Sequence, residues 1–362
     1  MNQRDRTSPK ALGINRRKFI QYGSLAVGTS LVAACSGTNT ASSTNAASSS
    51  PASPQALDKI RFGTSWYAQA EHGGFYQAVA EGIYKAHGLD VAIQMGGPQV
   101  NTTQLLMGGA VDFVMATDCL VTLNSIAENI PKIAVAAMFQ KSPRVLIAHP
   151  QVNDLSQMKG KPIFIATSAN TSYWPFLKAK YGFTDDQKRA YNYNIAPFLA
   201  DKTSAQQGFV SSEPLTIAQK GGFEPKVFLL ADLGYQPYAN MIETQKELVE
   251  QNPDLVQRFV DASIKGWYSY LENPAPANEL IKKDNPEMTD EQLAYSVSKL
   301  KEHNILTNGE AGSLGIGAMT EQRWQSLFND MVKVGVLKAE TKYQDAFTLQ
   351  FINKGTEAYR TA

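Results

Sequence analysis

The sequence has few of the residues that build metal sites and disulfides. It contains two cysteines and four histidines among 362 residues. Cys35 lies in the N-terminal region, so Cys119 has no partner for an intramolecular disulfide in the rest of the chain. No histidine is close in sequence to a cysteine or to another histidine, and we therefore expect no metal ion.

An excess of charge of one sign and long hydrophobic runs are also missing. The 34 Lys and Arg against 33 Asp and Glu give a formal net charge of +1, which offers no basis for nucleic-acid binding. After the N-terminal region, no run reaches the roughly 18 apolar residues of a membrane-spanning helix. A chain of this length suits two lobes better than one.

The N-terminus contains the features of an export signal. Residues 1–19 are rich in lysine and arginine, and a short run of apolar and small residues follows from Ile20 to Ala34. The stretch Arg16-Arg17-Lys18-Phe19-Ile20 resembles a twin-arginine signal, although general secretion stays open. Because Leu31-Val32-Ala33-Ala34-Cys35 resembles a bacterial lipobox, we expect cleavage before Cys35. A lipid on Cys35 would then anchor the protein to the membrane on its exported side, periplasmic or at the cell surface.

The next segment has no hydrophobic pattern. Residues 36–56 consist almost entirely of serine, alanine, threonine, asparagine and proline. Such a composition cannot bury a core, so we expect a disordered tether. The folded body is predicted to begin at Leu57.

From Leu57 onward, alternating strand and helix periods predict an α/β fold with parallel strands. The alternation runs to about residue 139 and restarts near Arg144. The predicted strands are 59–63, 89–95, 111–116, 133–139, 144–148, 161–166 and 226–231. The helices predicted among them are 74–87, 102–108, 119–128, 173–181, 204–208 and 215–220.

Beyond Tyr238 the pattern is mainly helical. The predicted helices are 244–251, 253–272, 275–284, 289–303 and 320–335. We expect this part to pack on the first unit, which gives two Rossmann-like lobes: residues 57–142 with 241–362, and residues 143–240. The chain would cross between the lobes near 140–145 and 236–243, forming a two-strand hinge. A cleft between hinged lobes is a favoured ligand site.

An ordered series of motifs resembles a known family. The motifs are Trp66 followed by Glu71-His72-Gly73-Gly74-Phe75-Tyr76, Glu81-Gly82-Ile83-Tyr84, Gly88-Leu89-Asp90-Val91, Gly96-Gly97-Pro98, Gly109-Ala110-Val111-Asp112-Phe113, Lys159-Gly160-Lys161-Pro162-Ile163 and Glu213-Pro214. In this order they resemble the solute-binding proteins of nitrate, sulfonate and taurine importers, in the branch similar to thiamine pyrimidine synthase. The resemblance covers about residues 57–340.

The resemblance implies a type II periplasmic binding fold, a small-molecule ligand and an ABC importer partner with a permease and an ATPase. We expect a monomer. The branch also includes a pyridoxal-phosphate-dependent synthase, whose lysine and histidine positions fall here on Ala116 and Leu120, and whose cysteine cluster is missing. An aldimine needs a lysine amine. We therefore expect a binding protein without a cofactor rather than an enzyme.

Candidate ligand-binding residues follow from the position of ligands in open α/β lobes. Ligands lie at the carboxyl ends of strands, next to helix N-termini. The residues at these places are Trp66, Tyr67, His72, Asn101, Thr117, Asp118, Ser168, Thr171, Trp174, Glu213, Asp232 and Tyr235. No catalytic residue is predicted.

Aromatic rings combined with carboxylates suit a flat heterocycle. Trp66 would stack on a ring, and Glu213 or Asp118 would accept hydrogen bonds from an aminopyrimidine edge. Structural roles stay open for the same residues: Trp66 in the core, Asp118 as a helix N-cap and Glu213 as a surface charge. The preferred ligand is a pyrimidine precursor of thiamine.

Two other ligand classes stay open. The hydroxyl-rich run 168–172 would suit nitrate, taurine or an alkylsulfonate, which usually also needs a basic group. Lys161, Lys178 and Lys202 are near in sequence, but none has an obvious loop position. Riboflavin is a further alternative, since aromatic loops also suit an isoalloxazine ring.

Overall fold

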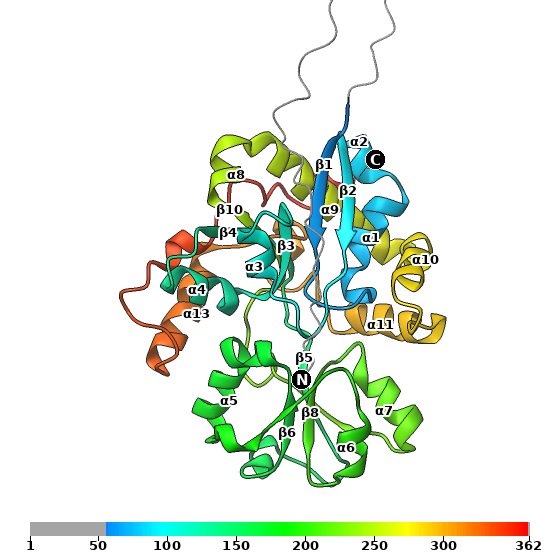
Figure 1. Ribbon diagram of the computed structural model, residues 1–362, viewed down its shortest axis with the longest axis vertical. Coiled ribbons are helices and arrows are strands. Elements are labelled where there is room, and N and C mark those ends of the chain that lie inside the picture. Colours follow the sequence, from blue (N-terminus) through cyan, green and yellow to red (C-terminus); the bar gives the residue numbers. More distant parts are fainter. Residues whose placement is uncertain (1–55, 361–362) are drawn as a thin grey trace, which may run out of the picture. The chain divides into compact units, whose positions relative to one another are not determined.

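The computed structural model describes residues 56–360. The predicted export signal, the lipobox with Cys35 and the tether up to residue 55 lie outside the described residues. Within 56–360, no helix is both long enough and apolar enough to cross a membrane. The described chain contains two five-stranded sheets, each with its own helices (Figure 1).

The first sheet has the order β2-β1-β3-β10-β4. Its strands are β1 (Asp58–Gly63), β2 (Leu89–Gln94), β3 (Phe113–Asp118), β4 (Lys132–Phe139) and β10 (Ala239–Gln245). Strand β1 pairs in parallel with β2 and β3, whereas β10 runs antiparallel to both β3 and β4. We call this sheet and the helices packed on it the first lobe.

The second sheet has the order β7-β6-β8-β5-β9. Its strands are β5 (Arg144–Ala148), β6 (Ile163–Ile165), β7 (Lys188–Ala190), β8 (Ala205–Phe209) and β9 (Lys226–Leu229). Strand β6 is parallel to β7 and β8, but β5 is antiparallel to β8 and β9. The prediction of parallel strands is therefore wrong for part of each sheet. We call this sheet and its helices the second lobe.

Helices cover both sheets. In the second lobe, α5 (Tyr173–Tyr181) and α7 (Glu213–Gly221) lie on either side of the strands in Figure 1, with α6 (Ala196–Ala200) near the end of the lobe. The first lobe carries α1 (Gly73–Ala80), α2 (Ile83–Ala86), α3 (Thr102–Met107), α4 (Cys119–Ala127), α8 (Lys246–Gln251), α9 (Pro253–Glu272), α10 (Ala275–Asp284), α11 (Asp290–Glu302), α12 (Ala311–Leu314), α13 (Glu321–Lys333) and α14 (Glu357–Arg360).

The C-terminal helices pack against the first unit. Helix α9 lies against α1, where a Cβ added to Gly74 would come within 2.2 Å of the Trp267 ring. Phe259 on the same helix stacks on Phe113 of β3, with ring centroids 4.1 Å apart. The glycine permits this close approach of helix and indole, because any larger residue would overlap the ring.

Three segments differ from their sequence-based predictions. The helix expected over 74–87 is interrupted after α1, because Gly82 adopts a left-handed φ of 70° before α2 begins. Residues 204–208 were expected to be helical, but β8 occupies this region and hydrogen-bonds to β6 and β5. Residues 239–245 form the inserted strand β10 instead of a crossing followed by a helix. In both strands, pairing with neighbours distant in sequence overrides local propensity.

The chain passes between the sheets twice. It leaves the first sheet after Phe139 and enters the second at Arg144, and it returns between Leu229 and Ala239. We call residues 140–143 the first crossing and residues 230–238 the second crossing.

Candidate functional site

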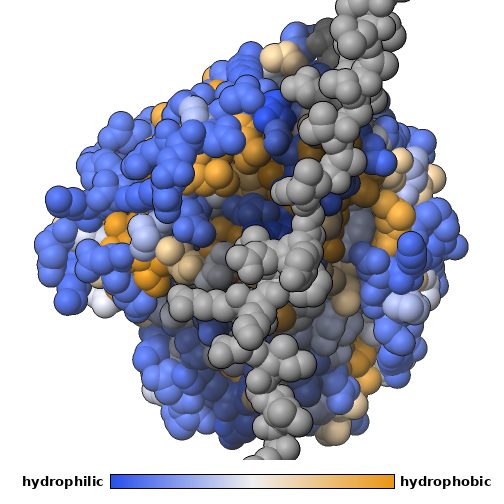
Figure 2. Space-filling view, turned by 45° about the horizontal axis from the view of Figure 1, so that its top comes forward, coloured by the Kyte–Doolittle hydropathy of each residue, from blue (hydrophilic) through white to orange (hydrophobic). Residues whose placement is uncertain are grey.

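A cavity of about 500 Å³ is lined by residues of both lobes. The first lobe contributes the loop after β1, the loop before α3 and the end of β3, and the second lobe contributes the starts of β5 and α7, the end of β8 and the 3-10 turn Thr167–Thr171. The volume lies within the range of small-molecule sites. In the space-filling view the surface is mainly hydrophilic, with separate hydrophobic patches between the hydrophilic residues (Figure 2).

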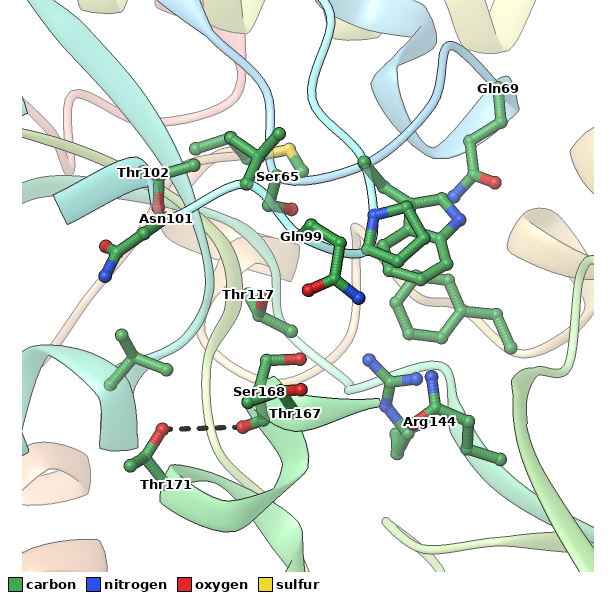
Figure 3. Close-up of a pocket in the computed structure, with 18 of the residues that line it drawn as sticks. Ser65, Gln69, Gln99, Asn101, Thr102, Thr117, Arg144, Thr167, Ser168 and Thr171 are labelled. Atoms are coloured by element: carbon green, nitrogen blue, oxygen red, sulfur yellow. Dashed lines mark hydrogen bonds between the residues drawn. The ribbon is translucent and has the colours of Figure 1, made fainter. Parts of the chain in front are cut away.

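Several residues predicted from the sequence line this cavity. They are Trp66, His72, Asn101, Thr117, Ser168, Thr171 and Glu213. Asn101 also caps α3, because its side chain accepts a hydrogen bond of 3.0 Å from the Gln104 backbone N–H. Gln69 and Gln99 approach from the first lobe, while Thr167 and Ser168 face them from the second (Figure 3).

Asp118 and Tyr235 do not line the cavity, because they bond to each other. The Tyr235 hydroxyl donates to the Asp118 carboxylate at 2.9 Å. Asp118 is the N-cap of α4 and accepts from the backbone N–H of Leu120 at 3.1 Å. Both side chains are buried. The structural role of Asp118 that the sequence left open is therefore the one observed.

Trp174, Asp232 and Tyr67 are also absent from the cavity lining. The Trp174 indole is buried and donates to Asp185 at 2.8 Å, which fixes it inside the second lobe. Asp232 pairs with Lys141 at 2.7 Å, joining the two crossings. Tyr67 lies beside Trp66, with ring centroids 5.9 Å apart.

Three aromatic rings from the two lobes meet at the edge of the cavity. Tyr193, in the second lobe, lies 6.2 Å from Trp66 and 5.8 Å from Tyr67 by ring centroids. Tyr193 has a φ of 69°, a left-handed conformation that is strained for a residue with a bulky side chain. Since Trp66 itself lines the cavity, this cluster gives one side of the site an aromatic wall.

The basic group of the cavity is Arg144, which was missed in the sequence. Its guanidinium is half-buried and lies over the Phe209 ring at 4.3 Å and the Tyr173 ring at 5.1 Å. Arg144 is the first residue of β5, directly after the first crossing. The basic residues predicted near the hydroxyl-rich loop were lysines. The signal that could have identified Arg144 is its position directly after the first crossing, which places the start of β5 at the cleft.

Gln207 was missed because its strand was predicted to be a helix. Its carboxamide oxygen accepts from the Ala166 backbone N–H at 2.6 Å and from the Tyr173 hydroxyl at 2.7 Å. Two donors on one oxygen fix the orientation of the amide. The Nε2 group of this cavity-lining residue therefore remains as an oriented donor.

Buried ionisable groups surround the same space. Glu213 accepts from the Tyr191 hydroxyl at 2.9 Å and from the Phe209 backbone N–H at 2.8 Å, and burial raises its pKa. Burial lowers the pKa of His72 to about 3, so the ring is neutral at neutral pH, and its Nδ1 has no partner among the described residues. Burial also raises the pKa of Glu71 to about 7, although Glu71 accepts from the Ser211 hydroxyl.

The acids and histidines of residues 56–360 do not converge on a metal site. No three or more His, Cys, Asp or Glu side chains in this part of the chain gather closely enough to hold a metal ion. Cys119 is buried, and burial raises the pKa of its thiol. The cavity lining includes aromatic faces, amides, hydroxyls, the Arg144 guanidinium, the His72 ring and the Glu213 carboxyl.

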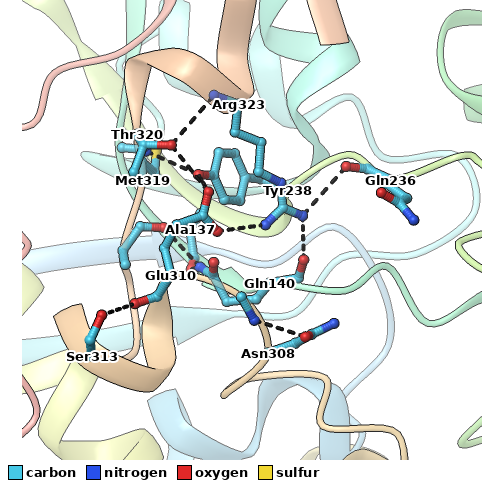
Figure 4. A network of polar contacts seen from close by, with 12 residues as sticks. Ala137, Gln140, Gln236, Tyr238, Asn308, Glu310, Ser313, Met319, Thr320 and Arg323 are labelled. Atoms are coloured by element: carbon cyan, nitrogen blue, oxygen red, sulfur yellow. Dashed lines mark hydrogen bonds and ion pairs between the residues drawn. The ribbon is translucent and has the colours of Figure 1, made fainter. Parts of the chain in front are cut away.

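Arg323 of α13 ties the crossings to the first lobe (Figure 4). Its guanidinium donates to the backbone carbonyl of Gln140 in the first crossing and, at 3.4 Å, to that of Gln236 in the second. It also pairs with Glu310 at 3.0 Å and lies 4.1 Å from the Tyr238 ring centroid. One side chain of the first lobe thus bonds to both crossings.

Comparisons with known proteins match this architecture. The chain is 27% identical over 341 residues to the riboflavin-binding protein RibY of Chloroflexus aurantiacus, covering 90% of this chain and 95% of that protein. It is 21% identical over 343 residues to the formylaminopyrimidine-binding protein of Halalkalibacterium halodurans, covering 91% and 98%. The alkanesulfonate-binding protein SsuA from Xanthomonas axonopodis pv. citri, bound to MOPS, has a TM-score of 0.59 at 13% identity, covering 82% and 99%.

The structural likeness confirms the predicted two-lobed periplasmic binding protein fold. The resemblance inferred from the ordered motifs is confirmed by a match over residues 69–277, more than half of the chain. This protein therefore belongs to the NMT1/THI5 like family.

Proposed function

We propose that the protein is the ligand-binding component of an ABC importer and that it binds a flat nitrogen heterocycle, with riboflavin as the first candidate. The observation that carries the proposal is a cavity of about 500 Å³ with the Trp66 wall on one lobe and the Arg144 and Gln207 donors on the other. A ring stacked on Trp66 would present its edge to these donors. The riboflavin-binding relative supports this choice because it is similar along nearly its whole length.

A pyrimidine of the thiamine-precursor type is the second candidate. It is favoured by the carboxylate of Glu213 in the cavity lining, which would accept hydrogen bonds from an exocyclic amine. The formylaminopyrimidine-binding relative supports it as well. The cavity size favours the larger isoalloxazine with its ribityl chain, whose hydroxyls would meet the threonine and serine side chains.

We infer noncovalent binding from the residues at the two synthase positions. Ala116 lies on β3 and Leu120 on α4, and both are buried. No lysine is among the side chains that line the cavity in the described chain. A pyridoxal aldimine would need a lysine amine in the cavity, whereas noncovalent binding needs none.

Calorimetric titration of the purified protein tests the proposal. Riboflavin, formylaminopyrimidine, an aminopyrimidine alcohol, nitrate and an alkanesulfonate are titrated separately under the same conditions. The proposal predicts saturable binding of a heterocycle and a rise in melting temperature with its concentration. Binding of nitrate or the sulfonate without any heterocycle response would reject it.

We also propose that the protein is exported, lipidated on Cys35 and held near its permease as a monomer. The motive is the sequence pattern of residues 1–35. Expression of the full chain with labelled fatty acid should label the wild type and leave Cys35→Ser unlabelled. Replacing Arg16 and Arg17 by lysine separates the two export routes, since a twin-arginine signal would stop functioning while a general signal would not. Light scattering would show a dimer if the monomer proposal is wrong.

A further inference from the structure

Arg144 is a charged side chain without an acceptor. Within residues 56–360 its guanidinium makes no hydrogen bond or ion pair, although it is half-buried at the cavity. Arginine stays protonated at any physiological pH, and a partly desolvated charge normally has a partner. The guanidinium carbon lies over the rings of Phe209 and Tyr173, and these contacts leave its N–H groups available.

The free Nε2 donor of Gln207 lies on the same face of the second sheet as Arg144. In the antiparallel register, Arg144 lies opposite Phe209, and Gln207 is two residues before Phe209 on β8. Residues two apart in a strand share a face, and all three line the cavity. The Gln207 amide cannot turn over without breaking its bonds from Ala166 and Tyr173. Its oriented Nε2 and the Arg144 guanidinium therefore lie on one face of the sheet as two donors of the same cavity.

The surrounding acids decide what kind of acceptor these donors suit. Arg144 exerts an electrostatic effect on the buried carboxyls of Glu71, Asp118 and Glu213. None of them lies within 4.0 Å of the guanidinium, since no ion pair of Arg144 occurs within residues 56–360. Wherever these acids are ionised, they would repel a full anion in the cavity and so oppose its pairing with the arginine. A neutral carbonyl oxygen, which carries only partial charge, would bond to the donors without that repulsion.

We propose that Arg144 and Gln207 form a carbonyl-binding subsite that selects an oxo-substituted heterocycle over an amino-substituted one. The inference rests on the proposed function, because it assumes that a heterocycle occupies the cavity. It assigns to the second lobe the recognition of ring carbonyls, such as the two that flank the ring N–H of a pyrimidinedione, while Trp66 contacts the ring face. Riboflavin carries such an edge, and an aminopyrimidine does not.

Two substitutions test the subsite. Arg144→Lys keeps the charge but loses the planar fork, and Gln207→Glu keeps the bonds from Ala166 and Tyr173 while replacing the free donor by an acceptor. The probes are riboflavin, its isolated ring system lumichrome, and 4-amino-5-hydroxymethyl-2-methylpyrimidine. Each variant should weaken binding of both oxo-substituted rings roughly tenfold to a hundredfold, as expected for hydrogen bonds to charged or oriented donors. Gln207→Glu should weaken the aminopyrimidine less or strengthen it.

The control is Arg189→Lys, an exposed arginine of the same lobe whose guanidinium bonds backbone carbonyls outside the cavity. It should bind every probe as the wild type does, and melting curves should show that all variants are folded. Unchanged preference for oxo over amino rings in both cavity variants would overturn the subsite while leaving the proposed function intact. A wild type that binds nitrate or an alkanesulfonate and no heterocycle would reject both. Equal loss of all three probes in Gln207→Glu would also reject the subsite, because it would indicate general damage to the cavity.

Discussion

The hydroxyl of Tyr235 donates a 2.9 Å hydrogen bond to the carboxylate of Asp118. The bond connects the second crossing to the N-cap of α4, and both residues are buried. Two side chains that the sequence suggested as ligand contacts therefore satisfy each other. Their pairing helps to set the position of the second crossing relative to the first sheet.

Tyr235→Phe should destabilise the protein and leave ligand affinity almost unchanged. Loss of the hydroxyl leaves Asp118 with its α4 backbone donors but without Tyr235, which should cost about 1–3 kcal/mol of unfolding free energy. Urea denaturation measures that cost, and titration with the ligand measures affinity. A large loss of affinity at unchanged stability would place Tyr235 at the ligand instead.

Trp66→Ala should weaken a stacked ligand by about 1–3 kcal/mol, judging from stacking of bases on aromatic side chains. Trp66 is only partly buried, so the loss should appear mainly in the dissociation constant rather than in the melting temperature. The matched control is Trp174→Phe, which alters a buried tryptophan bonded to Asp185 outside the cavity lining. That variant should lose stability but retain affinity, and the reverse pattern would contradict the assignment of Trp66.

Glu71 should make the stability fall as the pH rises. Burial raises the pKa of its carboxyl from an ordinary value of 4.5 to about 7. Between these values the folded protein binds more protons than the unfolded chain, so the contribution is full below pH 4.5 and declines up to pH 7. Above pH 7 the ionised Glu71 carboxyl lowers the free energy of unfolding by on the order of 3 kcal/mol.

Denaturation of Glu71→Gln at pH 5 and pH 8 measures this effect. The unfolding free energy of the variant minus that of the wild type should be larger at pH 8 than at pH 5, because glutamine has no proton to lose. Glu128→Gln, at an exposed position on the same lobe, is the control and should show no such difference. Parallel pH profiles of the wild type and Glu71→Gln would show that Glu71 does not titrate in this range.

Arg323→Met should loosen both crossings. The variant removes the donors to the carbonyls of Gln140 and Gln236 and leaves Glu310 without its ion pair. We expect a loss of about 1–3 kcal/mol of unfolding free energy. Small-angle scattering without ligand should also show a larger radius of gyration than for the wild type. Arg189→Met controls for loss of a surface arginine, and equal changes in both variants would argue against a specific role at the crossings.

Part of the candidate site could be predicted from the sequence. Trp66 and Ser168 come shortly after strands and Thr117 lies at the end of β3, and the rule that ligands lie at strand ends places such residues together without knowledge of the fold. Arg144 begins its strand rather than following it, and it reaches the cavity because β5 is antiparallel to β8 and β9. A prediction that assumed parallel strands therefore considered the wrong end of β5.

Local periodicity by itself determined the helices and strands whose apolar residues repeat regularly, such as α9 and β4, and the ordered motifs determined the family. Only the tertiary structure decided that residues 205–209 form a central strand, that Asp118 bonds to Tyr235, and that Arg144 and Gln207 share a face. Helix periodicity is a property of neighbours in the chain, so the sequence contains it directly. Strand pairing and the partners of buried polar groups depend on segments that are distant in sequence, and only folding brings those together.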